Sequence, residues 1–205
     1  MDKPTIVLAS HNVNKLIELK QSLDKSVRFL SLNDIGFHQD IPETATTLEA
    51  NALLKAKTVS RFCQLPTLSD DTGLFVKALN GLPGVRSARY AGERATTNQN
   101  IEKLLTAMEQ NRDRSAIFRT VFCLFHHHEP HFIKGEVEGL ITTKKQGEKG
   151  FGYDPIFIPQ GHQHTFGQMS LDQKNLYSHR AKAINALSDF LLYNKFPRAI
   201  GVQLL

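Results

Sequence analysis

The spacing of apolar residues along the chain predicts strands and helices in alternation. The short, β-branched run Thr5–Ala9 indicates a buried strand, and after a polar turn the apolar positions 16, 19 and 23 have helical spacing. Leu48, Ala52 and Val59 lie on one side of a longer helix. The whole pattern predicts strands at Thr5–Ala9, Val27–Leu32, Pro66–Leu68, Ala116–Phe125, Phe132–Ile141 and Ile156–Ile158, and helices at Val13–Leu23, from about Thr47 to Cys63, at Thr97–Gln110 and at Ser178–Tyr193.

The segments between these elements carry turn and cap signals. Thr46 with Glu49 three residues later has the form of a capping box, and the Gly- and Pro-rich segment 80–92 is typical of a loop. His126–Pro130 would form a hairpin tip, and Asp70–Gly73 would follow the end of a strand. Because strands occur partly in strand–helix units and partly as a hairpin, we expect an α/β fold, a mixed β-sheet flanked by helices, in a single domain over residues 1–205.

Composition and charge narrow the class of protein. The 205 residues include 25 Lys and Arg against 20 Asp and Glu, a formal charge of +5 that favours anionic ligands but is too small to indicate duplex nucleic acid. Two cysteines cannot form a disulfide framework and indicate a reducing compartment, so we expect a cytoplasmic protein. No apolar run has the length of a membrane span, and the first apolar run is too short for a signal peptide.

The segment Ser10-His11-Asn12-Val13-Asn14-Lys15 connects a predicted strand to a predicted helix. A helix N-terminus offers free N–H groups to an anion, Ser10 and Asn12 add polar side chains, and Lys15 adds a positive charge. The glycines of a Walker A loop are missing. By itself the segment fits a capped helix with a solvated lysine better, because such caps are common.

Acidic residues gather at Asp70-Asp71-Thr72-Gly73. Two adjacent carboxylates before a glycine can hold a hard cation while one of them activates water, and a solvated turn is the alternative. Glu43, in a separate acidic loop, is either a further oxygen ligand or a solvated acid. Asn51 and Lys55 are four residues apart and share one side of a helix away from its apolar stripe, where a lysine is usually solvated.

Aromatic and cationic residues characterise a third region. In Gly150-Phe151-Gly152-Tyr153-Asp154-Pro155 the glycines allow close approach of a ligand and an aromatic face can stack on a base, while a tight turn with buried aromatics is the alternative. Lys174 precedes Ser178-His179-Arg180 at a helix start, where Arg gives bidentate recognition and His can donate or accept a hydrogen bond. The chain thus has groups that can donate hydrogen bonds to phosphate, carboxylates that can bind a cation, an aromatic loop, and the pair His179 and Arg180, which could recognise a nucleobase. Together these features are typical of a nucleotide hydrolase.

Six motifs follow one another along the chain: SHNVNK at 10–15, ETATTLEANALLKA at 43–56, LSDDTGL at 68–74, GLPGVRSARYAG at 81–92, FGYDPIF at 151–157 and SHRAKA at 178–183. This combination resembles the non-standard purine nucleoside triphosphate pyrophosphatases, the inosine/xanthosine triphosphate pyrophosphatase family. The similarity extends from residue 5 to about residue 191. It implies Mg2+-dependent cleavage of ITP, XTP and deoxy-ITP to monophosphate and pyrophosphate, a long mixed sheet bent between two lobes with the site in their cleft, and a homodimer.

The resemblance also implies a role for individual residues. Asp71 would accept the proton of the attacking water, and Glu43, Asp71 and Asp70 would bind Mg2+. The substrate would be bound by Ser10, His11, Asn12, Val13, Asn14, Lys15, Lys55, Thr72, Phe151, Gly152, Tyr153, Asp154, Lys174, His179 and Arg180. Of these, Lys174, His179 and Arg180 would read the 6-keto purine. The expected partners are small nucleoside triphosphates, with neither nucleic acid nor a membrane.

The chain departs from the family pattern at a few positions. Ala45 stands where a Gly is common and Ala50 where a Glu is common. Thr72 replaces the usual Ser, and Ser10-His11 replaces a frequent Thr-Gly or Ser-Gly pair. None of these changes removes a proposed cation ligand or phosphate-binding lysine.

Other functions remain open from the residues themselves. A Maf-type pyrophosphatase acting on modified pyrimidine nucleotides is the nearest enzymatic alternative. A nucleic-acid-binding protein would explain the pI of about 9.2 but not the paired acids. His126–His128 with His131, or His162 with His164, could bind a metal, but a solvated hairpin tip fits better because neither group has zinc spacing with cysteines.

Overall fold

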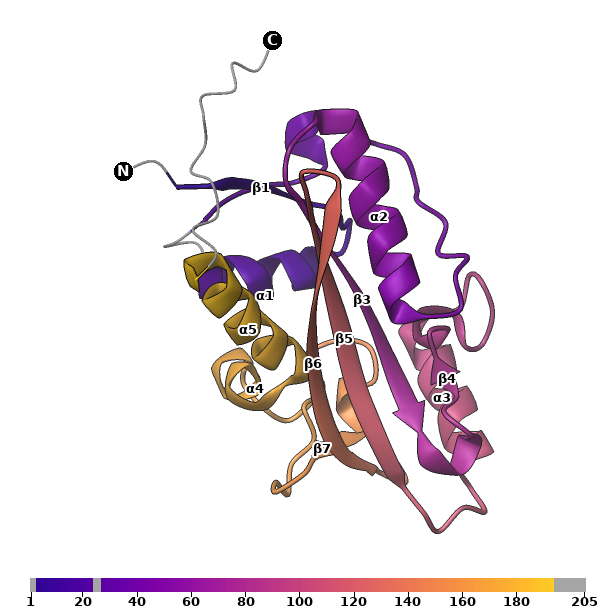
Figure 1. Cartoon of the computed structure of the whole chain (residues 1–205). Coiled ribbons are helices and arrows are strands. Elements are labelled where there is room, and N and C mark those ends of the chain that lie inside the picture. The colour runs from indigo at the N-terminus through magenta and orange to yellow at the C-terminus, as the bar shows by residue number, and fades with distance from the viewer. Residues whose placement is uncertain (1–2, 24–26, 194–205) are drawn as a thin grey trace. The chain divides into compact units, whose positions relative to one another are not determined.

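The computed structural model describes residues 3–23 and 27–193 (Figure 1). Its strands are β1 (Thr5–Leu8), β2 (Arg28–Leu30), β3 (Thr67–Val76), β4 (Pro83–Gly84), β5 (Ser115–His126), β6 (Glu129–Ile141) and β7 (Phe157–Pro159). Its α-helices are α1 (Val13–Leu23), α2 (Leu48–Cys63), α3 (Thr97–Ala107), α4 (Leu171–Tyr177) and α5 (His179–Tyr193). Within these residues no helix has the length and apolar character needed to cross a membrane.

The strands form one mixed sheet in the order β2-β1-β3-β5-β6-β7, with β4 paired to β3. Strand β1 is parallel to both of its neighbours, with Val7 opposite Leu30 in β2 and opposite Thr67 in β3. The pairs β3–β4 and β6–β7 are antiparallel. The predicted α/β class with a mixed sheet and flanking helices is therefore confirmed.

The chain divides into two compact units, each made of separate stretches of sequence. Unit 1 comprises the described parts of Met1–Asp71, Val121–Lys134 and Ala183–Leu205. Unit 2 comprises Thr72–Thr120 and Gly135–Lys182. Strands β3, β5 and β6 and helix α5 each begin in one unit and end in the other.

Unit 1 buries both faces of its strands. In β1, Ile6 and Leu8 join a core cluster with α1 and α5, whereas Val7, and Ala9 just after the strand, join a cluster with Val59 of α2. The same alternation holds in β5, where Phe122 and Leu124 pack with α1 and α5 residues and Cys123 and Phe125 pack with α2 residues. Successive strand residues point to opposite faces, so a continuous apolar run is the pattern expected of a strand covered by helices on both sides.

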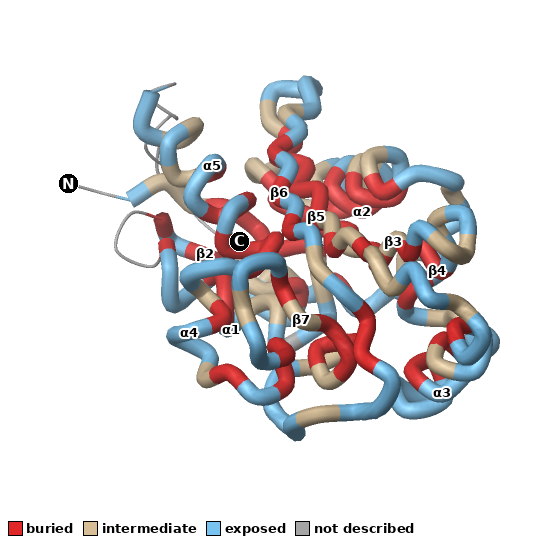
Figure 2. The backbone as a smooth tube through the Cα atoms, turned by 90° about the horizontal axis from the view of Figure 1, so that it is seen from below, coloured by how far each residue is buried: buried red, intermediate tan, exposed pale blue. Residues whose placement is uncertain are grey.

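Unit 2 has a core built on one set of alternating strand positions. Leu74 and Val76 of β3, Phe118 of β5 and Val137 of β6 share a cluster with α3 and with the segment that contains Tyr153 and Phe166. Figure 2 shows buried and exposed positions in alternation along α3. Ile101 and Leu104 of this helix and Met108 at its C-cap are buried, and Leu105 is half-buried.

Most predicted elements are present, with shifted ends. Helix α1 has the predicted bounds, β2 is shorter than predicted, and α3 ends at Ala107 rather than Gln110. Helix α4 was not predicted; Ser170 caps it, with Gln173 completing a capping box. The predicted loop 80–92 holds the short strand β4 and a 3-10 helix at Ser87–Arg89.

The prediction that a strand ends before Asp70–Gly73 is wrong. Strand β3 runs through all four residues and ends at Val76. Asp, Thr and Gly have low or mixed strand preference on their own, so pairing with neighbouring strands of the sheet, rather than propensity, holds this segment extended. The predicted hairpin is present, but its tip is only His127-His128, both with positive φ, because β5 and β6 extend further than predicted.

The predicted capping box of Thr46 and Glu49 is also wrong. The N-cap of α2 is Thr47, whose side chain accepts a hydrogen bond from the backbone N–H of Ala50 at 3.1 Å. Glu49 pairs instead with Lys134, with 2.6 Å between its Oε1 and the lysine Nζ. The cap is thus one residue later than the sequence pattern indicated.

We expect Thr47→Ala to lower the free energy of unfolding by about 1 kcal/mol, because it leaves the Ala50 N–H without its cap acceptor. The matched control is Thr46→Ala, which removes the same hydroxyl one residue earlier and should change stability by less than about 0.5 kcal/mol. Urea titration of both variants measures the difference. Equal losses, or a larger loss for Thr46→Ala, would contradict this assignment of the cap.

Candidate active site

Strand geometry directs the adjacent acids Asp70 and Asp71 to opposite faces of β3. Leu68, two residues before Asp70, packs in the cluster that contains α1 and α5 residues. Ser69, two residues before Asp71, donates its hydroxyl to the Ala52 carbonyl of α2. Because side chains alternate along a strand, Asp70 faces α1 and Asp71 faces α2. The two carboxylates therefore belong to two separate groups of polar contacts.

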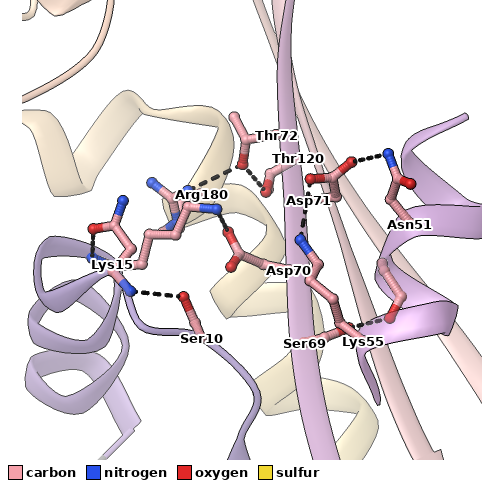
Figure 3. A network of polar contacts seen from close by, with 12 residues as sticks. Ser10, Lys15, Asn51, Lys55, Ser69, Asp70, Asp71, Thr72, Thr120 and Arg180 are labelled. Carbon is pink, nitrogen blue, oxygen red and sulfur yellow. Dashed lines mark hydrogen bonds and ion pairs between the residues drawn. The ribbon is translucent and has the colours of Figure 1, made fainter. Parts of the chain in front are cut away.

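Asp71 is held by two residues of α2, one turn apart (Figure 3). The Asn51 Nδ2 donates to Asp71 Oδ2 at 3.2 Å, and the Lys55 Nζ donates to Asp71 Oδ1 at 3.2 Å. The same ammonium donates to Glu43 Oε1 at 2.5 Å. Asn51 also accepts the backbone N–H of Ala45 at 2.9 Å, which fixes its amide and the loop that carries Glu43. Lys55 thus joins two carboxylates that are 28 residues apart in sequence.

Burial and charge oppose each other in this group. The side chains of Lys55 and Asp71 are 10% and 6% exposed. Burial raises the pKa of Asp71 to about 6, with a further rise from Glu43 and a partial offset by Lys55. Burial alone would lower the pKa of Lys55, but the carboxylates of Asp71 and Glu43 outweigh it and raise that pKa. The lysine therefore stays charged, and Asp71 is a carboxylate at neutral pH that can take up a proton in mildly acidic solution.

On the other face, Lys15 pairs with Asp70 across 2.9 Å between Nζ and Oδ2. Lys15 is in the first turn of α1, and the start of that helix is built by its neighbours. Ser10 Oγ accepts the N–H of Asn12 at 3.2 Å, and Asn12 Oδ1 accepts the N–H of Lys15 at 3.3 Å. Asn12 therefore acts as a cap, as the structural alternative predicted, but Lys15 is paired rather than solvated.

Unit 2 contains a second buried ion pair, Lys174 with Asp154, whose side chains are each 3% exposed and 2.8 Å apart. Asp154 Oδ2 also accepts the backbone N–H of Phe151 at 2.8 Å, so the pair fixes the aromatic loop. The Lys174 Nζ lies 4.4 Å from the centroid of the Phe151 ring. Gly150 is required here, because a Cβ at its position would lie 2.1 Å from Asp154 Oδ2.

Arg180 and His179 begin α5 and face β5 and the aromatic loop. The Arg180 Nη2 donates to Thr72 Oγ1 at 3.0 Å, and its guanidinium carbon lies 5.5 Å from the Phe151 ring centroid. The His179 ring stacks on Phe118 with centroids 4.7 Å apart and planes inclined by 13°. Both side chains are almost fully buried. Phe151, Lys174, His179 and Arg180 thus form one group within unit 2.

Some of the predicted site residues contact one another in the groups described above, and others lie outside them. Glu43, Lys55 and Asp71 meet on one face of β3, and Lys15 meets Asp70 on the other. Tyr153 points elsewhere than its loop neighbours: it is buried in the unit 2 core and its hydroxyl donates to the Ser87 carbonyl at 2.9 Å. His11, Asn12 and Asn14 are exposed, and Gly152 adds no side chain. Val13 is the first residue of α1.

Three contact residues were not predicted to belong to the site. Asn51 was recognised only as sharing a helix side with Lys55, and its complete burial was not expected. Thr120 is buried and its Oγ1 lies 2.7 Å from Thr72 Oγ1. Phe118 supplies the ring on which His179 stacks. Thr120 and Phe118 carry no sequence signal, because their partners lie 48 and 61 residues away.

The donor set around Lys55 fits a hard cation only in part. Carboxylate oxygens of Glu43 and Asp71 converge on the ammonium group of Lys55. Carboxylate oxygens are the type of ligand that Mg2+ prefers. Yet over residues 3–23 and 27–193 no three His, Cys, Asp or Glu side chains gather as a metal-binding group. Mg2+ is commonly bound by one or two carboxylates with substrate phosphates and waters, so the two carboxylates fit that mode. The histidines at 126–131 and 162–164 form no such group either.

Fold and contacts together define a class: a mixed α/β protein that buries lysines against carboxylates and sets an arginine and a lysine beside an aromatic loop. A sequence model of the Ham1 family matches residues 6–190. The chain belongs to the Ham1 family, which confirms the resemblance found in its motifs.

Two relatives and two solved structures illustrate the similarity. The dITP/XTP pyrophosphatase of Flavobacterium psychrophilum is 51% identical over 90% of this chain and 97% of the relative, and that of Porphyromonas gingivalis is 48% identical over 93% and 98%. A HAM1 protein from Coxiella burnetii has a TM-score of 0.87 at 40% identity, covering 93% of this chain and 99% of that chain. The Staphylococcus aureus Ham1 protein has a TM-score of 0.85 at the same identity and coverage. Pyrophosphatases of this family are in general metal-dependent hydrolases.

In the metal-free protein, we expect Asp71 to make stability fall as pH rises from about 4 to about 6. Its pKa is raised to about 6 by burial, from 3.8, so the folded protein holds the proton more tightly than the unfolded chain does. The stabilisation is complete below pH 4 and is lost as pH rises through 6. Relative to Asp71→Asn, the wild type should lose about 3 kcal/mol of unfolding free energy across this range.

Urea unfolding of both proteins in EDTA at several pH values measures this difference. Asp172→Asn, on the exposed side of α4, is the matched control and should follow the wild type. A stability gap between wild type and Asp71→Asn that is constant, or that moves in favour of the wild type as pH rises, would contradict the raised pKa of Asp71.

Proposed function

We propose that this chain hydrolyses the non-standard purine nucleoside triphosphates dITP, XTP and ITP to the nucleoside monophosphate and pyrophosphate. Membership of the Ham1 family and the names of its relatives support this activity. The observation on this chain that best supports the activity is the contact of Lys55 with both Glu43 and Asp71. This contact brings the buried carboxylate of Asp71, a possible general base, together with a second carboxylate that could bind a cation. The enzyme is thus a hydrolase of phosphoric anhydrides.

Glu43 and Asp71 would hold Mg2+, whereas Asp70, on the other face of β3, would pair with Lys15 rather than bind the same ion. When bound, the ion would neutralise charge on the phosphates and on the departing pyrophosphate. Lys15 and Lys55 are charged groups on the two faces of the same strand, and each is now paired with a carboxylate. We expect both to bind phosphate oxygens of the substrate together with the segment 10–15, where the start of α1 presents backbone N–H groups.

Asp71 is the proposed general base. In the proposed reaction water attacks the α-phosphorus and pyrophosphate leaves, and the water must lose a proton as it attacks. Asp71 is ionised at neutral pH even without a metal, so its carboxylate can accept this proton. Asn51 and Lys55 hold its two oxygens in fixed directions, which sets the carboxylate for this task.

The group in unit 2 is the proposed base-reading site. Phe151 offers a ring face for stacking, and Lys174 and Arg180 lie beside that ring. Both cations are hydrogen-bond donors, and the 6-keto oxygen of hypoxanthine and xanthine is an acceptor, whereas the 6-amino group of adenine is a donor. A buried donor left facing an amino group costs binding energy, so the site would discriminate against adenine. His179 would contribute a further polar contact, and Thr72 would touch the substrate.

The whole chain is proposed to act as one enzyme domain containing both units. A homodimer and a cytoplasmic location stay predictions from the resemblance and from the cysteine content. Neither a Maf-type activity on pyrimidine nucleotides nor nucleic-acid binding is favoured by an observation on this chain, because the family match is to Ham1 proteins over residues 6–190.

A product assay tests the activity directly. The purified protein with Mg2+ is offered XTP, ITP, dITP, GTP and ATP, and pyrophosphate and orthophosphate are measured separately. We expect pyrophosphate from the first three substrates, almost none from GTP and ATP, and no turnover in excess EDTA. Orthophosphate as the product, or equal turnover of all five nucleotides, would reject the proposal, and undiminished turnover in EDTA would reject the cation site.

Asp71→Asn should lower kcat for XTP by a factor of roughly a thousand, because it removes the proposed base while keeping the shape of the side chain. Asp113→Asn is the control, since this carboxylate is on the surface and pairs with Lys77. Its kcat should equal that of the wild type. Circular dichroism of each variant establishes that the fold is intact, and wild-type turnover by a folded Asp71→Asn would remove this residue from the role of base.

A further inference from the structure

Strand β5 places two buried side chains directly behind the residues proposed to read the base. Phe118 stacks on His179, and Thr120 contacts Thr72, which accepts a hydrogen bond from Arg180. Phe118 and Thr120 are two residues apart and so project from the same face of β5. Thr120 is fully buried and Phe118 is 5% exposed. The first turn of α5 therefore packs against buried side chains of a single strand.

The contacts of Thr120 form a short chain of hydroxyl groups that ends at the guanidinium. Its Oγ1 lies 2.7 Å from Thr72 Oγ1, the usual length of a strong O–H···O hydrogen bond. Thr72 Oγ1 in turn accepts the Arg180 Nη2–H at 3.0 Å (Figure 3). Arginine can only donate, so one lone pair of Thr72 is committed to Arg180, and either hydroxyl can be the donor in the hydrogen bond between Thr72 and Thr120.

This arrangement restricts where the guanidinium can lie. A threonine side chain has few χ1 rotamers, and the one that Thr72 adopts aims its Oγ1 at both Arg180 and Thr120. The hydrogen bond to Thr120 favours that rotamer of Thr72 whether or not a substrate is present. Arg180 is 1% exposed, so water is not available to replace a lost acceptor. A small change in Thr72 would thus move the plane in which Arg180 presents its remaining N–H groups.

We propose that Thr120 is a positioning residue for recognition of the base: through the hydroxyl of Thr72 it fixes the orientation of the Arg180 guanidinium, and so sharpens discrimination between 6-keto and 6-amino purines. Thr120 itself does not touch the substrate. The inference rests on the proposed function, since it assigns to Thr120 a share in the specificity of the same site.

A purely structural role for Thr120 makes different predictions. Loss of a buried hydroxyl would lower stability and the fraction of folded enzyme, but would leave the specificity of the folded fraction unchanged. Loss of a positioning contact would instead weaken binding of the purine base, which is remote from the α-phosphorus of the substrate. It should therefore raise KM for XTP and leave kcat nearly unchanged, as expected when binding common to ground state and transition state is lost.

The experiment compares three variants in the full chain with Mg2+. Thr120→Val deletes the hydroxyl and keeps the shape, Thr120→Ser keeps the hydroxyl, and Thr67→Val is the control. Thr67 is equally buried in β3, but it faces α2 and its hydroxyl donates to the Leu65 carbonyl. kcat and KM are measured for XTP and ATP, with thermal unfolding of each variant. Thr120→Ala replaces Thr120→Val if the valine variant does not fold.

We expect Thr120→Val to lower the ratio of kcat/KM for XTP over ATP about tenfold, mainly through KM for XTP. Thr120→Ser and Thr67→Val should stay within about twofold of the wild type. In an Arg180→Ala background, Thr120→Val should have no further effect on the ratio, because the group it positions is gone.

Two results overturn the proposal while leaving the function intact: an unchanged ratio in folded Thr120→Val, or equal losses in Thr120→Val and Thr120→Ser. An effect of Thr120→Val that persists in full without Arg180 overturns it as well. A wild-type protein that hydrolyses XTP and ATP equally would instead reject the proposed function, and this inference with it.

Discussion

The ion pairs of Lys55 with Glu43 and Asp71 are the interaction on which the acidic part of the candidate site depends. Two carboxylates close together and largely out of water repel each other and lose hydration, which makes such a pair unfavourable. The charge of Lys55 offsets both effects for Glu43 and Asp71. It also joins α2, the loop before it and the middle of β3 at one point, so the position of each is fixed by the same contact. The residual burial cost appears in the raised pKa of Asp71.

Much of the fold could be predicted from the sequence because periodicity reports burial directly. The bounds of α1, the apolar side of α2 and the β5–β6 hairpin follow from apolar spacing, and the structure has all three. The family could be identified because its motifs hold their order over nearly the whole chain. Such signals are local: each depends on residues within a few positions of one another, which is the range over which a sequence pattern can be interpreted.

The features that could not be predicted depend on partners far away in sequence. Asp70–Gly73 has the composition of a turn, and it is a strand because it pairs with strands that are distant in the sequence. Lys55 lies beside the apolar stripe of its helix, where a lysine usually contacts solvent. Its carboxylate partner Asp71 is 16 residues further along the chain. Thr120 gives no signal at all, since a buried threonine in a strand is common. Tertiary contacts, not propensity, decided these cases.

The alternation of the two units along the chain has a consequence for the history of the gene. All four points at which the chain passes from one unit to the other lie inside regular elements, at 71/72 in β3, 120/121 in β5, 134/135 in β6 and 182/183 in α5. No single contiguous fragment of the coding sequence encodes either unit. Exchange of one unit for that of a homologue would therefore require crossovers at all four of these points, each inside a strand or a helix.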